Sequence, residues 1–223
     1  MDKDIYEFRH PNLPYWPGYS FLWVREDRGL WECRGDLISL DKLIFPLVKE
    51  KRVAIQAGGA MGMFPKRMAQ VFDAVYTFEP TPVSFNCLAF NCPEANVIPF
   101  HAALGKEPGF VRSGTAENEE GNLGANCIVG KGLVPTILID NLGFDICDLL
   151  MLDIEGYELF ALQGAIETIR RCHPVIVLED KGCSDWNNFG YSRGHVAKYL
   201  EEEAGYTTHS RIHGDRDIIL IHE

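Results

Sequence analysis

The sequence predicts an α/β domain in which a mostly parallel sheet carries helices on both faces. First, short apolar segments alternate with amphipathic segments from Lys51 onward, as in a parallel sheet joined by crossover helices. Second, the glycine-rich segment QAGGAMG (56–62) directly follows the first apolar segment. Third, the last two β-like segments are separated only by Gly214-Asp215, which predicts a hairpin and an antiparallel final strand.

Composition and charge narrow the class of protein. The chain has 223 residues, of which 46% are hydrophobic and 24% charged, so it forms a folded core rather than a disordered chain. The formal net charge of −11 argues against general nucleic-acid binding and against docking on anionic membranes. The sequence has no long apolar run and its first residues are too charged for a signal peptide, so we expect a cytoplasmic protein with reduced, mostly buried cysteines.

Residues 1–50 are predicted to form a cap and a lead-in helix before the main domain, which we place at 51–223. The first 35 residues are rich in aromatic residues and lack helical periodicity. Asp36 is then a candidate N-cap for a helix whose apolar residues, from Leu37 to Val48, recur at intervals of three and four. The aromatic residues are suited either to a substrate pocket or to a dimer interface, and both uses stay open.

The main domain is predicted to contain seven strands with helices between them, two of the strands forming the terminal hairpin. The five predicted parallel strands are 53–56, 74–78, 97–102, 149–153 and 175–179. The predicted helices are 63–72, 82–91, 158–171 and 194–203. Residues 113–132 are polar and glycine-rich, and we expect them to form a loop that is either functional, as a substrate loop, or disordered.

The glycine-rich turn and the next strand predict a pocket for a nucleotide-like ligand. Small residues at positions 58, 60 and 62 let the backbone approach such a ligand, whereas a dinucleotide fingerprint would need glycine where Met63 stands. Glu79 ends the second strand, where a carboxylate can accept hydrogen bonds from both hydroxyls of a ribose. The predicted ligand-binding residues are Gln56, Gly58, Gly59, Ala60, Gly62, Glu79, Pro80 and Asp153.

Over residues 53–179 the sequence resembles the FkbM-type family of S-adenosylmethionine-dependent methyltransferases. The D-x-E-G-x-E segment at 153–158 is the most specific element of this resemblance. The other matching pieces are QAGGAMG (56–62), FEPTP (78–82), Asn91, AALG (102–105), TILIDNL (136–142), LQGA (162–165) and HPVIVLE (173–179). The resemblance implies the Rossmann-like class I methyltransferase fold, which ends in an antiparallel hairpin.

The resemblance also implies S-adenosylmethionine as the cofactor and, as the reaction, O-methylation of a small molecule or of a sugar or glycan hydroxyl. Three positions depart from the family's usual pattern, which has Asp at Gln56, Asn at Ala60 and Lys at Met151. Gln56 lacks the charge that would attract the ammonium group of the cofactor. We therefore expect either weaker cofactor binding or another carboxylate in that role.

Acidic residues at two strand ends are the candidates for chemistry. Asp153 and Glu155 follow the fourth strand, and we expect Asp153 to act as a base or to position the acceptor. Asp153 with Glu179 and Asp180 is also a candidate ligand set for magnesium, which the family pattern does not require. Alternatively, Glu158 and Glu179 merely act as caps or pair with neighbouring basic residues such as Arg170, Arg171 or Lys181.

The loop after the fifth predicted strand is the candidate acceptor-binding segment. Trp186, Tyr191 and Arg193 combine aromatic rings with a cation, which suits a sugar ring or an anionic group of a small-molecule or carbohydrate acceptor.

Three alternatives to O-methylation remain open. The first is a nitrogen acceptor in place of oxygen. The second is an NAD-type dinucleotide-binding oxidoreductase, which the missing third glycine and the terminal hairpin disfavour. The third is a binding module that keeps the fold but not turnover, and the departures at Gln56 and Ala60 keep this interpretation open.

Overall fold

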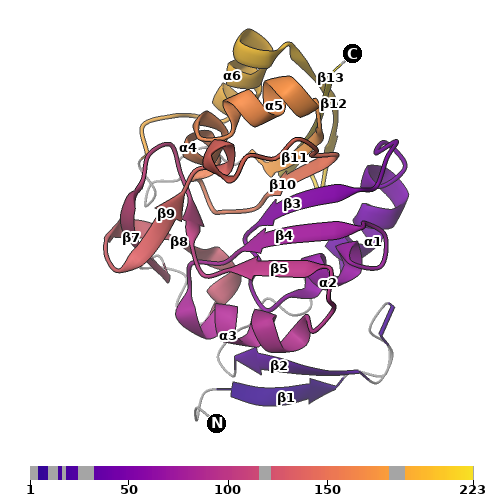
Figure 1. The fold of residues 1–223 in the computed structure, drawn as a ribbon, viewed down its shortest axis with the longest axis vertical. Coiled ribbons are helices and arrows are strands. Elements are labelled where there is room, and N and C mark those ends of the chain that lie inside the picture. The colour runs from indigo at the N-terminus through magenta and orange to yellow at the C-terminus, as the bar shows by residue number, and fades with distance from the viewer. Residues whose placement is uncertain are drawn as a thin grey trace.

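The computed structural model describes residues 5–9, 15–16, 19–24, 33–115, 122–180 and 189–222, and it confirms the predicted α/β fold (Figure 1). Its main sheet has seven strands in the order β12-β13-β11-β10-β3-β4-β5. The five central strands pair in parallel, and β13 runs antiparallel to both of its neighbours. The strands are β3 (Val53–Ala57), β4 (Ala74–Phe78), β5 (Val97–Phe100), β10 (Leu149–Leu152), β11 (Val175–Glu179), β12 (Tyr206–Ile212) and β13 (Asp217–His222).

Helices cover both faces of this sheet because successive side chains of a strand point to opposite faces. In β10, Leu149 and Met151 belong to one apolar cluster, and Leu150 and Leu152 belong to the other. The first face carries α1 (Cys33–Ser39), the π-helical segment Leu40–Ile44, α2 (Met63–Met68) and α3 (Pro82–Asn91). The second face carries α4 (Glu158–Gln163), α5 (Ile166–Cys172) and α6 (His195–Ala204).

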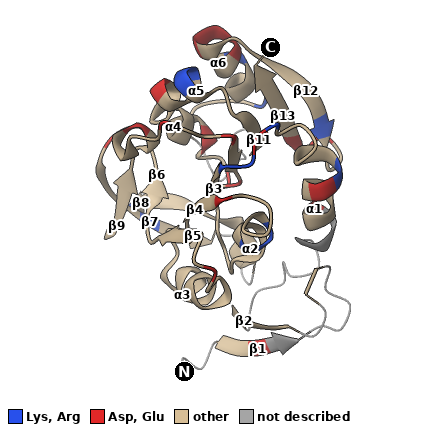
Figure 2. Cartoon of the chain, turned by 45° about the vertical axis from the view of Figure 1, so that its right-hand side comes forward, with Lys and Arg blue, Asp and Glu red and all other residues tan. Residues whose placement is uncertain are grey.

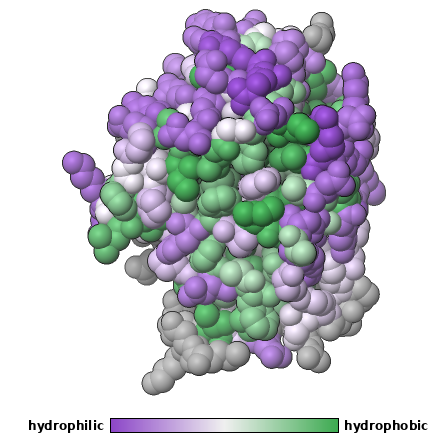
Figure 3. Space-filling model, in the orientation of Figure 1, coloured by the Kyte–Doolittle hydropathy of each residue, from purple (hydrophilic) through white to green (hydrophobic). Residues whose placement is uncertain are grey.

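Helices α4–α6 leave part of the second face uncovered beside β4 and β5. A shallow hollow there is lined by Tyr76, Phe100 and residues 142–146. Figure 3 shows apolar surface across the centre of this side of the molecule. Among the described helices, none is both long and apolar enough to cross a bilayer.

Three helices differ in extent from their predictions. The predicted helix 158–171 is broken into α4 and α5 at Gly164 and Ala165, and α2 ends at Met68 instead of at position 72. The first helix already begins at Cys33, so Asp36 lies in its first turn and is not the N-cap. Leu43, predicted to be on the buried face, is 44% exposed.

The described parts of the segment predicted as a long loop, 113–115 and 122–132, contribute to a second sheet instead. The order of this sheet is β6-β9-β7-β8, with β6 (Ala103–Leu104), β7 (Gly109–Thr115), β8 (Asn126–Lys131) and β9 (Val134–Ile137). A short 3-10 helix, Leu123–Ala125, leads into β8, and another, Ile139–Leu142, follows β9. Alternation is weak in this glycine-rich segment, which explains why its strands escaped prediction.

The N-terminal hairpin of β1 (Ile5–Arg9) and β2 (Ser20–Val24) lies beside α3 (Figure 1). Asn91, at the end of α3, connects the two. Its side-chain oxygen accepts a hydrogen bond from the Leu22 amide at 2.7 Å, and its side-chain nitrogen donates to the carbonyl oxygens of Leu22 and Met61 at 2.8 and 2.7 Å. Asn91 thereby joins β2 to the turn that follows β3.

Candidate functional site

A cavity lies at the carboxyl ends of the central strands, the edge at which parallel α/β sheets bind ligands. Its empty volume is ≈ 1330 Å³, which includes its mouth open to solvent. The walls come from the turn after β3, the end of β4, the start of β8, residues 153–157 and the turn between β12 and β13. Trp23 of β2 and Asp36 of α1 also line it, so residues from the N-terminal segment contribute to the wall.

The glycine-rich turn packs closely against the end of β10. The backbone amides of Gly58 and Gly59 donate to the Phe78 carbonyl oxygen at 3.1 and 3.0 Å. Gly58 has φ +83°, and a Cβ there would lie 1.9 Å from the carbonyl oxygen of Asp153, so only glycine fits. Ala60 also has a positive φ of 44°, an unusual conformation for a residue with a side chain.

Gln56 stabilises this turn from the protein interior, on the side away from the cavity. Its side chain is fully buried, its Nε2 donates to the carbonyl oxygens of Ala57 and Gly58 at 3.1 and 2.9 Å, and its Oε1 accepts from the Thr77 hydroxyl at 2.6 Å. Gln56 therefore does not reach the cavity, and neither Gly59 nor Gly62 lines it. The predicted ligand-binding residues that do line the cavity are Gly58, Ala60, Glu79, Pro80 and Asp153.

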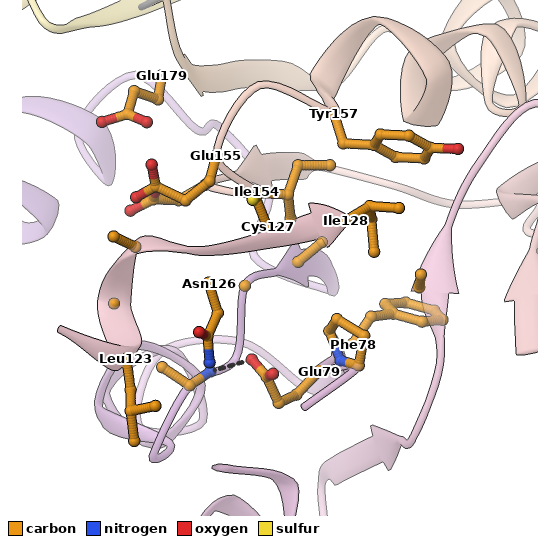
Figure 4. Close-up of a pocket in the computed structure, with 18 of the residues that line it drawn as sticks. Phe78, Glu79, Leu123, Asn126, Cys127, Ile128, Ile154, Glu155, Tyr157 and Glu179 are labelled. Carbon is orange, nitrogen blue, oxygen red and sulfur yellow. Dashed lines mark hydrogen bonds between the residues drawn. The ribbon is translucent and has the colours of Figure 1, made fainter. Parts of the chain in front are cut away.

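Glu79 lies on one side of the cavity and faces the turn (Figure 4). Its Oε2 accepts from the Ala60 amide at 2.8 Å, and its Oε1 accepts from the Thr81 amide at 2.7 Å. Each carboxylate oxygen can accept a second hydrogen bond. Burial raises the pKa of Glu79, partly offset by these two amide donors. The carboxylate is thus fixed in place with acceptor capacity remaining for a ligand.

Three acidic side chains meet on the opposite side of the cavity. Asp153, Glu155 and Glu179 each place a carboxylate oxygen within 4.8 Å of the other two. Figure 4 shows Glu155 and Glu179 close together and away from Glu79, and Figure 2 shows acidic positions gathered near β3, β4 and β11. Three such oxygens could hold a hard cation such as magnesium.

Asp180, by contrast, lies outside this group. Its side chain is fully buried, its Oδ1 accepts from the Gly194 amide at 2.8 Å, and its Oδ2 accepts from Arg211 at 2.8 Å. The structure therefore does not assemble the predicted set of Asp153, Glu179 and Asp180. Glu155 takes the third place because the chain turns sharply there, with positive φ at Glu155 and Gly156.

Arg216, in the turn before β13, lies beside the acidic group. Its guanidinium is 3.5 Å from Glu179 Oε1 and 3.2 Å from Asp36 Oδ2, and it donates to both oxygens of Asp217 at 2.9 and 3.1 Å. The hydrogen bond to Asp217, with the negative charges of Asp217, Asp36 and Asp153, raises the pKa of Arg216, which stays a cation. The turn spans 213–216 rather than the two predicted residues, since Ile212 pairs with Asp217.

Glu158 supports the backbone of residues 153–158 from inside the protein. Its Oε1 accepts from the amides of Ile154 and Gly156 at 3.0 and 3.3 Å, and its Oε2 lies 3.3 Å from the Tyr191 hydroxyl. Burial, reinforced by the nearby Glu155, raises the pKa of Glu158 to about 7. Glu158 thus caps this backbone segment, as one form of the alternative predicts, and does not pair with Arg170, which binds Glu167 and Glu203.

The predicted acceptor-binding residues lie elsewhere. Tyr191 is buried and donates to the Gly156 carbonyl oxygen at 2.6 Å, behind the cavity wall. Arg193 donates to the Asp215 carbonyl oxygen and is 3.9 Å from Asp180. Neither lines the cavity, and Trp186 falls outside the described residues. Tyr191 and Arg193 follow β11 as predicted, but their side chains bind backbone carbonyl oxygens outside the cavity.

Several residues that line the cavity were not predicted from the sequence. Trp23, Asp36 and Arg216 come from elements distant in sequence and carry no local motif. The stretch 122–128 also lines the cavity, and its polar, glycine-rich composition was the one signal that indicated a functional segment there.

The sequence model of the Methyltransferase FkbM domain matches residues 63–208. This chain belongs to the FkbM methyltransferase family. Solved structures of similar fold include methyltransferase FkbM from Methylobacillus flagellatus KT, at 15% identity and a TM-score of 0.53, covering 80% of this chain and 46% of that one. Trm5b from Pyrococcus abyssi is 12% identical with a TM-score of 0.51, covering 99% of this chain and 56% of that one.

The chain thus spans about half of the length of these two proteins, and at such identities the likeness shows the fold alone. The comparison with curated proteins finds no match. The seven-stranded sheet, its antiparallel β13 and the family match together identify the class I methyltransferase fold.

Proposed function

We propose that this chain transfers a methyl group from S-adenosylmethionine to a hydroxyl oxygen of a small molecule or of a sugar or glycan. The observation that carries the proposal is Glu79, a buried carboxylate fixed by two backbone amides beside the glycine-rich turn. This arrangement suits the two hydroxyls of a ribose, since a carboxylate oxygen can accept more than one hydrogen bond. The family membership supports the reaction type.

The other residues of the cavity fit the rest of that cofactor. Phe78, Leu104 and Ile128 supply apolar wall for a planar base. Gly58 and Ala60 supply wall without bulky side chains beside Glu79. Asp153 and Glu155 bring negative charge to the cationic sulfur and ammonium groups. These charges offset the absence of a charge at Gln56, whose side-chain amide donates a hydrogen bond to the Gly58 carbonyl oxygen in the turn. When bound, the cofactor would supply the electrophilic methyl group.

Within this proposal, Asp153 and Glu155 act on the acceptor. Methyl transfer to a hydroxyl needs the acceptor oxygen aligned with the methyl carbon and its proton removed. Both carboxylates line the cavity, and Glu155 lies opposite Glu79 (Figure 4). We assign Asp153 as the base or acceptor-positioning group, with Glu155 beside it. Alternatively, magnesium held by Asp153, Glu155 and Glu179 would assist loss of the proton by lowering the pKa of the hydroxyl.

We further propose that residues 1–50 form a cap on the methyltransferase domain at 51–223. Trp23 and Asp36 support this division because they reach the cavity wall from β2 and α1. Of the two uses considered for the aromatic N-terminus, this favours the acceptor pocket.

Calorimetric titration of S-adenosylhomocysteine tests the cofactor assignment. We expect saturable binding to the unmodified protein, roughly tenfold or more weaker in Glu79→Gln, because a hydrogen bond to a charged group contributes about 1.5–3 kcal/mol. Glu201→Gln on the exposed side of α6 is the matched control and should bind normally. NAD should not bind. Binding of NAD, or equal affinity in Glu79→Gln, would contradict the assignment.

Methyl transfer itself is tested by release of S-adenosylhomocysteine with hydroxyl acceptors, with and without magnesium. We expect turnover to fall at least about a hundredfold in Asp153→Asn, in the range for loss of a general base. Stimulation by magnesium that disappears in Glu179→Gln would assign a metal to the acidic group. Cofactor binding without turnover of any hydroxyl or amine acceptor would favour the binding-module interpretation.

A further inference from the structure

One end of the second sheet exposes large apolar side chains to solvent. Leu133, in the turn between β8 and β9, is 92% exposed, and Phe110 of β7 and Val129 of β8 are 63% and 41% exposed. Exposure of such side chains to water costs free energy. Single exposed apolar residues are common on protein surfaces, whereas a group of them at one place marks an interaction surface.

The backbone pairing shows that these residues form such a group. Val111, next to Phe110, pairs with Lys131 at the end of β8. The Gly132 amide donates to the Phe110 carbonyl oxygen at 3.4 Å, so Leu133, the next residue, lies at the same end of the sheet as Phe110. β7 and β9 lie at one side of the molecule (Figure 1), and Figure 3 shows apolar surface on that side. The group therefore projects outward.

This end of the sheet is basic although the whole chain is acidic. We define the tip of the second sheet as residues 105–112 and 129–136. Its charged residues, all exposed, are Lys106, Glu107, Arg112 and Lys131. Within the described part of the chain, neither Arg112 nor Lys131 forms an ion pair. Three cations and one anion give the tip a net positive charge, in a chain whose formal net charge is −11.

The local charge decides what the tip attracts. Charges more than a Debye length from a surface, about 8 Å at physiological ionic strength, are largely screened. The net charge argues against docking of the chain as a whole on anionic membranes, but it has little influence on a contact made by the tip alone. The tip therefore favours an anionic partner.

The size and the composition of the tip favour a membrane over a folded protein as that partner. A stable protein interface buries about 800 Å² on each side, which is far more than three side chains expose. Reversible membrane binding needs less, because a few apolar groups that enter the interfacial layer suffice when neighbouring cations contact anionic headgroups. Long basic side chains reach the headgroups while the apolar ones insert.

We propose that the tip of the second sheet docks on an anionic membrane surface, with Phe110 and Leu133 inserted and with Arg112 and Lys131 on the lipid headgroups. β8 connects this contact to the cavity. Residues 126–128 line the cavity wall, and Lys131 lies three residues, or about 10 Å of strand, further along the chain. Docking would hold the cavity close to the membrane, whatever cofactor and acceptor it binds.

Co-sedimentation of the full chain with lipid vesicles tests this inference. Vesicles of phosphatidylcholine with about 30% phosphatidylserine supply the anionic surface, and phosphatidylcholine alone is the comparison. We expect binding to the anionic vesicles and not to the neutral ones, and binding should weaken as salt is added. Phe110→Ser and Leu133→Ser should each weaken binding at least about tenfold, and Arg112→Gln and Lys131→Gln about fivefold each.

Matched controls carry the same changes at exposed positions elsewhere. Phe90 of α3 is 59% exposed, close to the value for Phe110, and Lys49 is exposed like Lys131. Phe90→Ser and Lys49→Gln should bind the anionic vesicles as the unmodified protein does. Urea unfolding of every variant should match the unmodified protein, because all of these side chains lie at the surface.

Four results would overturn the inference. These are no binding to the anionic vesicles, equal binding to the neutral ones, unchanged binding in Leu133→Ser, and an equal loss of binding in Phe90→Ser. Analytical ultracentrifugation adds one more test. An oligomer of the unmodified protein that dissociates in Leu133→Ser would assign the tip to a contact between copies of this chain in place of a membrane.

Discussion

At the scale of single residues, Glu158 combines an unusual pKa with a structural role. The residue sits inside the protein and accepts hydrogen bonds from two amides of the segment 153–158. Burial raises its pKa from the ordinary 4.5 to about 7. The folded protein therefore holds a proton here at pH values at which the unfolded chain has lost it.

This shift predicts how stability depends on pH. The contribution of Glu158 to the free energy of unfolding is fully present below about pH 4.5 and is lost as the pH rises to about 7, since only the unfolded chain ionises in that window. At 1.36 kcal/mol per pKa unit the loss is about 3 kcal/mol. Glu158→Gln resembles the protonated form, because its amide can donate to Tyr191. We expect this variant to match the unmodified protein in acid and to exceed its stability near neutral pH.

Urea unfolding of both proteins across this pH range measures the difference. The same difference at every pH would show that ionisation of Glu158 is not its cause. Glu201→Gln serves as control, and its stability should follow that of the unmodified protein.

The sequence predicted which residues lie at the cavity where their position at the end of a strand determines this, while their roles stay predictions. Glu79 and Asp153 were found because the carboxyl ends of parallel strands meet at one edge. Gln56 and Tyr191 were given ligand-binding roles, but their side chains turn toward backbone carbonyls. Local sequence does not fix such a choice, because it depends on which buried donors and acceptors the tertiary structure leaves unsatisfied.

At the scale of elements, two short motifs of the family resemblance meet in space. AALG (102–105) ends in β6 and Gly105, and LQGA (162–165) contains the break between α4 and α5. A Cβ on Gly164 would lie 2.0 Å from the carbonyl oxygen of Gly105. Because Gly164 has no side chain, the end of α4 can approach Gly105, which follows the cavity-lining strand β6.

This contact predicts that Gly164→Ala is destabilising. The added methyl cannot be accommodated without moving backbone, so we expect a loss of about 1–3 kcal/mol in the free energy of unfolding. Gly109→Ala is the matched control, since its Cβ would meet nothing within 4 Å, and its effect should stay within about 0.5 kcal/mol. Thermal and urea unfolding compare the two variants. Equal effects would contradict the packing role of Gly164.

The strands of the main sheet were predicted closely because buried parallel strands are continuous apolar runs between turns. The second sheet was missed because β7 and β8 contain glycine and polar residues and are largely exposed. The break after Gln163 was missed for a different reason. Residues 158–171 keep a helical pattern, and only the contact with Gly105 shows why the helix is interrupted.

At the scale of the whole molecule, the topology assembles the site from distant parts of the sequence. β13 inserts beside β11, so the turn at 213–216 brings Arg216 to the end of β11 and within reach of Asp36 in α1. The hairpin was predictable, but its contact with the N-terminal helix was not, because no local pattern encodes it. The division at residue 50 stays a proposal for the same reason.

The overall charge predicts the absence of general nucleic-acid binding. The chain carries a formal net charge of −11, and the charged residues among those described as lining the cavity are mostly acidic, so a phosphate backbone would be repelled both at a distance and at the site. The similarity to Trm5b from Pyrococcus abyssi concerns the fold and does not change this expectation. Fluorescence anisotropy with a labelled RNA hairpin should show a Kd weaker than about 10⁻⁴ M near physiological salt. A basic protein of similar size is the positive control. Saturable binding that weakens linearly with the logarithm of salt concentration would show a basic surface that the net charge conceals.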